Sequence, residues 1–203
     1  HQQLRLVASD LFLQKGFDAT SMDSIARTAG VSKRTPYIYY DSKHDLFSAV
    51  VLDFLEALEA QLAPIWQQQG PALAIITAAL TRYAEFALEN PARFDLIMTF
   101  ERKDFYPGRQ HALPVHADAC QQANDRLTAK LHDTLDKAIA NGELKTAMSP
   151  AQYGLLIWSA LAGVIGIALE RRTIMSATYD WTEQQMIQAF IQQFIDNSSP
   201  EDV

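Results

Sequence analysis

Cysteine is almost absent from this 203-residue chain, which contains only Cys120. A single cysteine cannot form an internal disulfide, so packing must stabilise the fold, and this usage is typical of a reducing cytoplasm. Basic residues are also scarce, because 17 Lys and Arg stand against 24 Asp and Glu, a formal net charge of −7. The hydrophobic share of 48% and the charged share of 20% are ordinary for globular proteins and argue against disorder.

The sequence also lacks the short motifs by which common enzyme classes are recognised. It contains no HExxH zinc motif, no GxxxxGK[ST] phosphate loop, no GxSxG nucleophile elbow and no CxxC pair. His116 and Cys120 are four residues apart and could share one helical face, but no further ligand follows at the spacing of a metal motif. We therefore expect no catalytic residue, no bound metal and no cofactor. No signal peptide is visible, and we expect a cytoplasmic protein.

Two short helical patterns separated by a turn lie between residues 21 and 40. In the first pattern, apolar residues recur at i, i+3, i+4 and i+7, which places on one helical face Met22, Ile25, Ala26 and Ala29. Ser21 can cap the start of this helix, Gly30 can end it in a left-handed conformation, and Ser32 can cap the helix that follows. Two helices joined by such a turn predict a helix-turn-helix, whose second helix enters the DNA major groove.

A longer pattern around this motif resembles the N-terminal DNA-binding domain of the TetR family of bacterial transcriptional regulators. The resemblance rests on residues at fixed spacing, namely Leu11-Phe12, Gly16-Phe17, Thr20, Ile25-Ala26, Ala29-Gly30-Val31-Ser32, Tyr37, Tyr40, Lys43 and Leu46-Phe47. It implies an all-α protein with an N-terminal three-helix DNA-binding domain and a C-terminal helical domain for effector binding and dimerisation.

One residue departs from the family pattern, because Pro36 stands where the family usually has Leu or Ile. A proline inside the recognition helix would remove a backbone hydrogen bond and push Thr35 out of helical geometry. We predict that this helix begins late, with Thr35 as its cap and Pro36 at its first position, where proline is tolerated.

The turn and the second helix carry most of the residues that we expect to contact DNA. Tyr37 matches a family position that usually binds a phosphate, and Lys43 would lie beside a helix N-terminus, which also attracts phosphate. Arg34 and Thr35 are the expected base readers, because arginine discriminates guanine best. Tyr40 matches a position that packs into the small core. The full expected DNA-binding set is Ser21, Ser32, Lys33, Arg34, Thr35, Tyr37, Tyr39 and Lys43.

Helices are expected along the whole chain, about nine in all. The apolar period predicts a first helix over residues 2–15, which covers the motif, and a long connecting helix over residues 43–66. Others are expected over residues 72–89, 92–101, 117–140, 150–172 and 182–196, with a loop over residues 102–114. We assign residues 1–47 to the DNA-binding domain and residues 48–203 to the effector-binding and dimerisation domain.

The helix expected over residues 150–172 is apolar on every side. Its length is borderline for spanning a bilayer, which needs roughly 20 residues, and its neighbours have the amphipathic pattern of soluble proteins. We therefore expect a buried helix and no membrane partner. Together with residues 182–196 it fits a helix-pair dimer interface, and the resembled family usually pairs its last two helices in a four-helix bundle. The expected interface residues are Gly163, Ile167, Ile187, Phe190, Ile191 and Phe194.

Aromatic residues are frequent on the expected inward faces of the C-terminal helices. For each single ring the plain interpretation is core packing, whereas an effector pocket between helices is apolar with a few polar groups. The resemblance favours a pocket for the domain as a whole, and the residues expected to line it are Phe54, Tyr83, Phe86, Phe94, Phe100 and Trp158.

The leading hypothesis is a homodimeric, ligand-responsive transcriptional regulator that binds a double-stranded DNA operator. In the resembled family such a protein is usually a repressor, released by a small molecule, here expected to be apolar or amphipathic. Two alternatives stay open: a helical carrier or enzyme with a degenerate DNA-binding domain, and a protein-interaction module. Only the regulator should show sequence-specific DNA affinity that falls steeply with salt.

Overall fold

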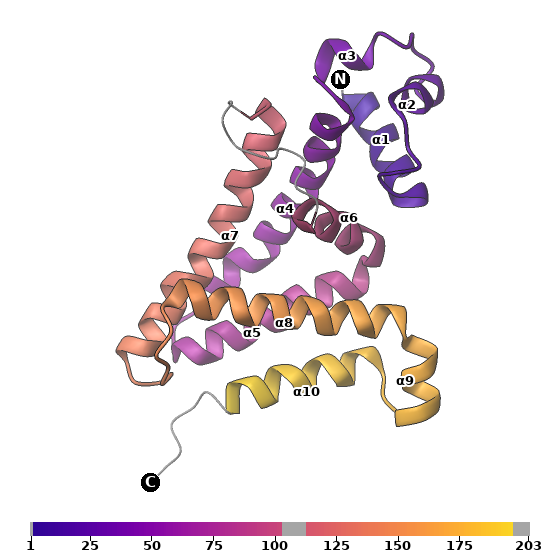
Figure 1. The fold of residues 1–203 in the computed structure, drawn as a ribbon. Helices are drawn as coiled ribbons and strands as arrows, with labels where there is room; N and C mark the ends of the chain where they lie inside the picture. Colours follow the sequence, from indigo (N-terminus) through magenta and orange to yellow (C-terminus); the bar gives the residue numbers. More distant parts are fainter. Residues whose placement is uncertain (1, 103–112, 197–203) are drawn as a thin grey trace. The chain divides into compact units, whose positions relative to one another are not determined.

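The structure is a computed structural model that describes residues 2–102 and 113–196. Within these ranges the protein contains ten helices and no strand, which confirms the predicted all-α class (Figure 1). The helices are α1 (Gln2–Lys15), α2 (Met22–Thr28), α3 (Pro36–Tyr39), α4 (Lys43–Trp66), α5 (Ala72–Glu89), α6 (Pro91–Arg102), α7 (Val115–Ala140), α8 (Pro150–Glu170), α9 (Arg172–Tyr179) and α10 (Glu183–Asp196).

Packing divides the chain into two compact units that are not continuous in sequence. Of the described residues, those within 1–57 and 92–125 form unit 1, and those within 58–91 and 126–203 form unit 2. The long helices α4 and α7 each contribute one part to unit 1 and the other part to unit 2. These units are defined by packing, whereas the predicted boundary after residue 47 is one of function, and it stays a prediction.

Unit 1 contains an aromatic cluster where α1, the segment after it and α4 meet. The ring centroids of Phe12 and Phe47 lie 5.1 Å apart edge to face, and those of Phe17 and Phe47 lie 4.8 Å apart. Such pairs contribute about 0.5–1.5 kcal/mol beyond their buried area. The stripe that α1 buries has the predicted helical spacing and consists of Leu4, Ala8, Leu11 and Phe12. This core supports α2, which packs on α1 and on α3.

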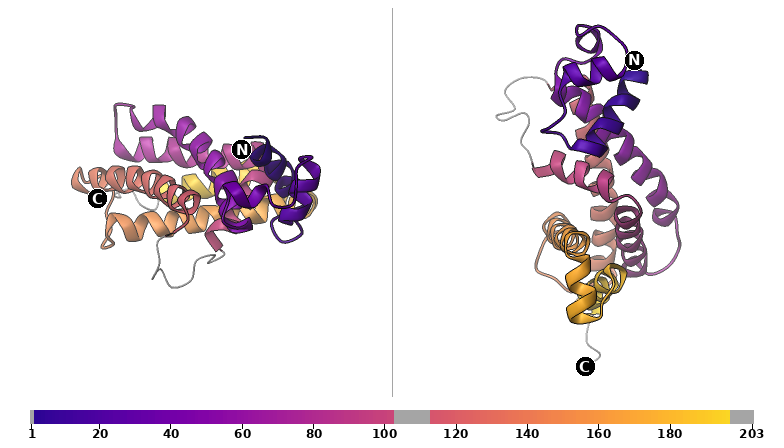
Figure 2. Two further views of the ribbon diagram at one scale, coloured as in Figure 1. Left: turned by 90° about the horizontal axis from the view of Figure 1, so that it is seen from above. Right: turned by 90° about the vertical axis from the view of Figure 1, so that its right-hand side faces the viewer.

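Unit 2 is built on three helices that pack side by side, α5, α8 and α10 (Figure 2). Each one buries apolar side chains at helical spacing, including Ile76 of α5, Leu161 of α8 and Ile191 of α10. α8 begins as predicted, with Pro150 at its first position, and Ser149 forms a reciprocal capping box with a glutamine three residues later.

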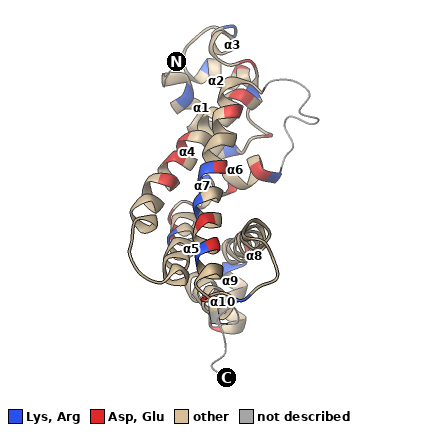
Figure 3. Ribbon diagram, turned by 90° about the vertical axis from the view of Figure 1, so that its left-hand side faces the viewer, with Lys and Arg blue, Asp and Glu red and all other residues tan. Residues whose placement is uncertain are grey.

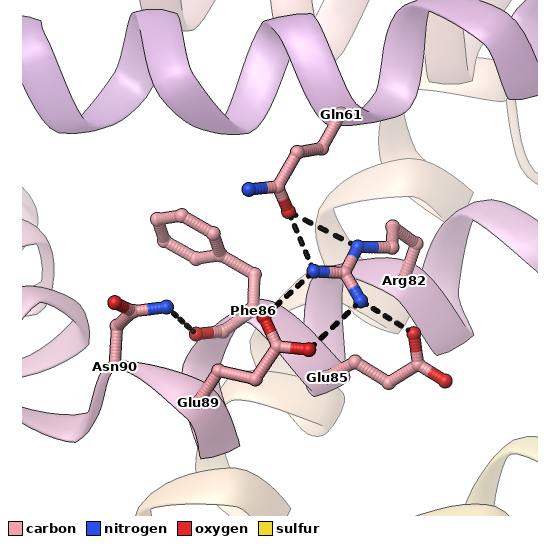
Figure 4. Close-up of polar contacts among 6 residues, drawn as sticks. All are labelled: Gln61, Arg82, Glu85, Phe86, Glu89 and Asn90. Atoms are coloured by element: carbon pink, nitrogen blue, oxygen red, sulfur yellow. Dashed lines mark hydrogen bonds and ion pairs between the residues drawn. The ribbon is translucent and has the colours of Figure 1, made fainter.

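Charged side chains tie α4 to its neighbours in unit 2. The Arg82 guanidinium donates to the Gln61 side-chain oxygen on α4 at 2.7 and 3.0 Å, and to the carboxylates of Glu85 at 2.7 Å and Glu89 at 2.8 Å on its own helix (Figure 4). Acidic residues are spaced along α4 as well (Figure 3). These acidic residues lie on helices that follow the helix-turn-helix in the sequence.

Two features of the C-terminal part bear on the sequence-based expectations. The helix α9 was not predicted, so that the described residues contain ten helices where about nine were expected. By length and composition alone, α8 could cross a membrane. Only 33% of its most apolar 18-residue stretch is buried within the chain. Within a single chain the expected burial of α8 is therefore only partial, because much of its apolar surface is exposed.

Candidate nucleic-acid interface

The first helix of the motif, α2, is closed at both ends by local hydrogen bonds. The hydroxyl of Ser21 accepts the backbone N–H of Ser24 at 3.2 Å, and the Ser24 hydroxyl accepts that of Ser21 at 3.1 Å. At the other end Gly30 has a φ of +69°, its N–H bonds to the Arg27 carbonyl, and the next N–H bonds to the Ala26 carbonyl. This Schellman arrangement favours glycine, because other side chains are strained at positive φ. The predicted cap and stop are both confirmed.

The second helix, α3, begins where the proline allows it to begin. Pro36 occupies the first helical position, as predicted, and its side chain is buried. Thr35 takes the cap position, but its side chain makes no cap hydrogen bond, and its hydroxyl instead lies 2.9 Å from the Ser32 hydroxyl. The expected displacement of Thr35 from helical geometry is also wrong, since its φ of −58° and ψ of −44° are helical. Backbone hydrogen bonds within residues 32–38 keep Thr35 in this helical conformation. They do so although a following proline disfavours the helical conformation at the residue before it.

The outward side of this turn and helix carries basic and aromatic side chains. Lys33, Arg34, Tyr37 and Tyr39 are all exposed. The Lys33 ammonium pairs with the Asp23 carboxylate at the surface, a contact that solvent screens. Among the residues that the structure describes, the Arg34 guanidinium has no hydrogen-bond or ion-pair partner. A phosphate or a base edge can therefore reach Arg34 without displacing an internal contact.

Lys43, at the first position of α4, has an internal use that the sequence did not reveal. Its ammonium donates to the backbone carbonyls of Phe17 at 2.9 Å and Thr20 at 3.0 Å, and it lies 4.0 Å from the centroid of the Phe17 ring. Lys43 thus fastens the segment between α1 and α2 to the start of α4. Its predicted contact with a DNA phosphate stays a prediction.

The C-terminal end of the recognition helix is held by a histidine from α7. Tyr40 is 1% exposed, which confirms its expected core position, and burial is the main cause that raises the pKa of its hydroxyl. The ring of His116 lies 5.0 Å from that of Tyr40, and its Nδ1 atom lies 3.2 Å from both oxygens of Asp45. Asp45 is 3% exposed and also accepts the backbone N–H of Asp41.

The sequence pattern did not indicate this contact, because it marked His116 only as a possible metal ligand. Nothing local in the sequence marks a pairing across 71 residues. Cys120, one turn further along α7, is fully buried, and this burial, with Glu101 nearby, raises the pKa of its thiol to about 12. Among the described residues no group of three or more His, Cys, Asp or Glu side chains could hold a metal ion.

The residues predicted to line an effector pocket are divided between the two units. Phe54, Phe94 and Phe100 belong to unit 1, whereas Tyr83, Phe86 and Trp158 belong to unit 2. Three of the six side chains are buried, namely Phe54, Phe86 and Phe94. A groove of about 420 Å³ in unit 2 is lined by other residues, Thr81, Gln188, Ala189, Ile191 and Gln192. The effector-binding role of the six aromatics stays a prediction.

The residues predicted to form a dimer interface differ in exposure. Ile187 and Ile191 are 2% and 3% exposed within one chain, so both already pack inside unit 2. Gly163 and Ile167 are exposed on α8, and a Cβ atom added at Gly163 would meet nothing within 4 Å. Phe190 and Phe194 are half-buried, with ring centroids 5.9 Å apart. For Gly163 and Ile167 the helical period could not indicate which side of the helix is exposed, because α8 is apolar on all sides.

Both parts of the chain match known protein families. Residues 5–50 match the bacterial regulatory proteins of the tetR family, and residues 76–190 match the tetracyclin repressor-like C-terminal domain. The chain belongs to the TetR family. It is therefore a helix-turn-helix transcriptional regulator, and in such a TetR regulator the helix-turn-helix is the part that meets DNA. The carrier or enzyme alternative has no support among these matches.

Individual relatives agree with this assignment. The HTH-type transcriptional activator FasR of Mycolicibacterium smegmatis is 28% identical over 158 residues, which cover 75% of this chain and 71% of FasR. A Rhodococcus sp. RHA1 protein of unknown function has the same fold, with a TM-score of 0.73 and 18% identity over 98% of this chain and 95% of that one. The ketosteroid transcriptional regulator KstR2 of Mycobacterium tuberculosis is similar at a TM-score of 0.61 and 18% identity, with 98% and 95% covered.

Proposed function

We propose that this TetR regulator binds a two-fold symmetric DNA operator as a homodimer and that a small apolar or amphipathic effector changes its affinity for that operator. The observation that carries the proposal is the capped helix-turn-helix whose outward face presents Arg34, Tyr37 and Tyr39 to solvent. A two-fold symmetric dimer places two such faces on successive major grooves when they lie about 34–36 Å apart. In this proposal the protein acts in the cytoplasm and catalyses no reaction.

The dimeric state is supported by the apolar surface that α8 leaves uncovered. Leu155, Leu156 and Ile167 are all exposed on this helix, and they lie on a side other than that of Ile157, Leu161 and Ile165, which are buried. A soluble protein rarely leaves a large contiguous apolar patch in water. A second copy of the same helix is the natural cover, since most soluble oligomers are symmetric dimers with self-complementary interfaces.

Whether an effector weakens or strengthens operator binding depends on which state of the protein, DNA-bound or released, the effector binds more tightly. A ligand shifts the equilibrium only by its difference in affinity between the DNA-binding and the released state. The coupling is reciprocal, so operator DNA should change effector affinity by the same factor by which effector changes operator affinity. Repression is the usual mode of the family, while the relative FasR carries the name of an activator.

The proposal is tested by selecting genomic fragments with the purified protein and titrating the best fragment against salt. We expect sequence-specific binding whose log affinity falls linearly with log salt, with a slope of roughly −0.9 for each phosphate neutralised. Equal affinity for selected and scrambled fragments would rule out the operator-binding function. Thermal-shift screening then identifies an effector, and equal effector affinity with and without operator would rule out regulation by that ligand.

A further inference from the structure

The single turn of α3 has one side inside the protein and one side in solvent. Pro36 and Tyr40 are four residues apart and both are buried, so they mark the inward side of the helix. Ile38 lies midway between them, and at about 100° per residue a position two residues away points to the opposite side. The exposed fraction of Ile38 is 73%, larger than that of Tyr37 or Tyr39 beside it. Ile38 is therefore the centre of the outward face.

The neighbours of Ile38 on this face are the expected base readers. Its N–H bonds to the Thr35 carbonyl at 3.1 Å, and the N–H of Tyr37 bonds to the Arg34 carbonyl at 3.1 Å, so the helical turn continues back to Arg34. Residues three and four apart are adjacent on such a turn. In the proposed complex, Ile38 would therefore enter the same major groove as Arg34 and Thr35.

The charge around Ile38 indicates which partner covers it. A single exposed isoleucine needs no partner in general. Three cations, Arg27, Lys33 and Arg34, lie between Asp23 and Asp41 with no carboxylate among them. Lys33 pairs with Asp23, so the positive charge that remains is that of Arg27 and Arg34. Positive charge close in sequence to an exposed apolar side chain suits DNA, whose phosphates flank the groove and whose thymines place a methyl group in it.

We propose that Ile38 selects thymine at one position of each operator half-site by packing against the thymine C5-methyl group. The proposal rests on the DNA-binding function described above. Isoleucine carries no hydrogen-bond donor or acceptor in its side chain and cannot read the polar edges of bases. Thymine alone presents an apolar group in the major groove, so the contact discriminates it from cytosine, adenine and guanine.

The test removes the methyl group and nothing else. A preferred operator is first selected from random-sequence DNA, and each thymine is then replaced singly by deoxyuridine. We expect the wild-type protein to lose about fourfold in affinity at one thymine of each half-site, as for exposure of one methyl-sized group. For the Ile38→Ala variant, replacing that thymine by deoxyuridine should leave the DNA affinity unchanged. Its preferences at the other positions of the operator should stay as in the wild type.

Two controls separate the contact from general effects. Leu6→Ala shortens another exposed apolar side chain, on α1 and outside the motif, and should keep the full methyl sensitivity. Ile38→Val retains a branched apolar side chain and should keep most of it. Thermal unfolding of each variant verifies that the helix-turn-helix is intact.

The outcomes also separate this proposal from the function on which it rests. A wild-type protein that selects no sequence would contradict operator binding itself. If the wild type selects a sequence but the Ile38→Ala variant responds to deoxyuridine as strongly as the wild type does, only the thymine contact is overturned. An Ile38→Ala variant that changes the oligomeric state and leaves DNA affinity unchanged would overturn it too, because Ile38 would then contact protein.

Discussion

Helix α2 of the helix-turn-helix and helix α5 of unit 2 are capped by contacts of different sequence range. In α2 the capping partners are three residues apart, and the Gly30 stop bonds to carbonyls within the preceding five residues. In unit 2 the start of α5 has no side-chain cap of its own, and the Leu73 N–H is instead accepted at 2.9 Å by the carboxylate of Glu143, 70 residues later. Likewise Arg126 donates to Glu59, 67 residues earlier. Short-range contacts leave a pattern in the sequence, and long-range contacts leave none.

The largest expected effect is the loss of the dimer when a charge is placed on the exposed side of α8 in unit 2. Gly163→Asp places a charge on the exposed side of α8, where the added side chain has space within one protomer. In a dimer interface that ion would be buried without a partner, at a cost of several kcal/mol. Sedimentation at micromolar concentration should show dimers for the wild type and monomers for the variant.

A control on the same helix is Ala151→Asp, at the exposed first turn, where a negative charge suits the helix dipole. It should stay dimeric and fold as well as the wild type. Monomeric wild-type protein, or a dimeric Gly163→Asp variant, would show that α8 does not form the interface.

A second change tests a long-range contact inside the helix-turn-helix region. Lys43→Met keeps the length of the side chain but leaves the carbonyls of Phe17 and Thr20 without the ammonium donor. We expect the free energy of unfolding to fall by about 1–3 kcal/mol, the typical cost of unsatisfied buried acceptors. Chemical denaturation measures this loss.

The same variant separates the internal role of Lys43 from its predicted phosphate contact. An internal role alone leaves the salt slope of DNA binding unchanged, whereas a lost phosphate contact makes the slope shallower by about 0.9 per contact. Arg34→Ala is the comparison, because Arg34 is exposed and its loss should change DNA binding without destabilising the fold. Unchanged stability of Lys43→Met would refute the internal role.

The long-range cap of α5 should have a smaller effect that depends on pH. The hydrogen bond from the Leu73 backbone holds the pKa of the Glu143 carboxyl below its usual value. The stabilisation that this hydrogen bond gives is therefore fully present above the pKa that Glu143 has in the unfolded chain. It is lost as the pH falls through the lower pKa that Glu143 has in the folded protein. Glu143→Gln should cost about 1 kcal/mol at neutral pH, as for other caps, and the difference from wild type should shrink in acid.

Denaturant unfolding at several pH values measures that difference. Asp136→Asn, an exposed carboxylate on α7 of the same unit, is the matched control and should cost little at any pH. A Glu143→Gln variant whose deficit is the same at neutral and acid pH would show that the charge of Glu143 does not cap α5.

The smallest expected effect concerns a purely local feature, the proline that starts α3. Pro36→Ala gives the unfolded chain more conformations, and it should lower stability by about 0.4–1 kcal/mol. The alanine N–H also allows a longer recognition helix, so the ranking of operator variants should change. Selection from random DNA with both proteins measures this change, and identical preferred sequences would mean that Pro36 affects stability alone.

Much of the fold could be predicted because helical periodicity is a local signal. The predicted helices over residues 2–15, 43–66 and 72–89 have the bounds that the structure gives, and others differ by one or two residues at their ends. The helix α9 was missed because its sequence, RTIMSATY, is rich in Thr, Ser and other weak helix formers. Of the loop predicted over residues 102–114, residues 103–112 lie outside the described residues, and Arg102 belongs to α6.

The candidate site could be predicted only in part, for the same reason. The cap at Ser21, the stop at Gly30 and the late start at Pro36 depend on neighbours a few residues away, and each one was predicted from the sequence. The internal bonds of Lys43 and the position of His116 beside Asp45 depend on residues 23 to 71 positions away. The outward position of Ile38 could have been found, because it follows from the helical period once Pro36 and Tyr40 are placed inside.

The contact between His116 and Asp45 also bears on how the protein is synthesised. A ribosome adds about 5–20 residues per second, so the 71 residues between these two side chains take roughly 4–14 s to appear. During that time the helix-turn-helix has left the ribosome, while Asp45 and the inner face of Tyr40 still lack the residue that covers them. The DNA-binding end of the nascent chain is thus completed only when α7 emerges. A chimera that joins this helix-turn-helix to another regulator after residue 47 would lose that cover permanently.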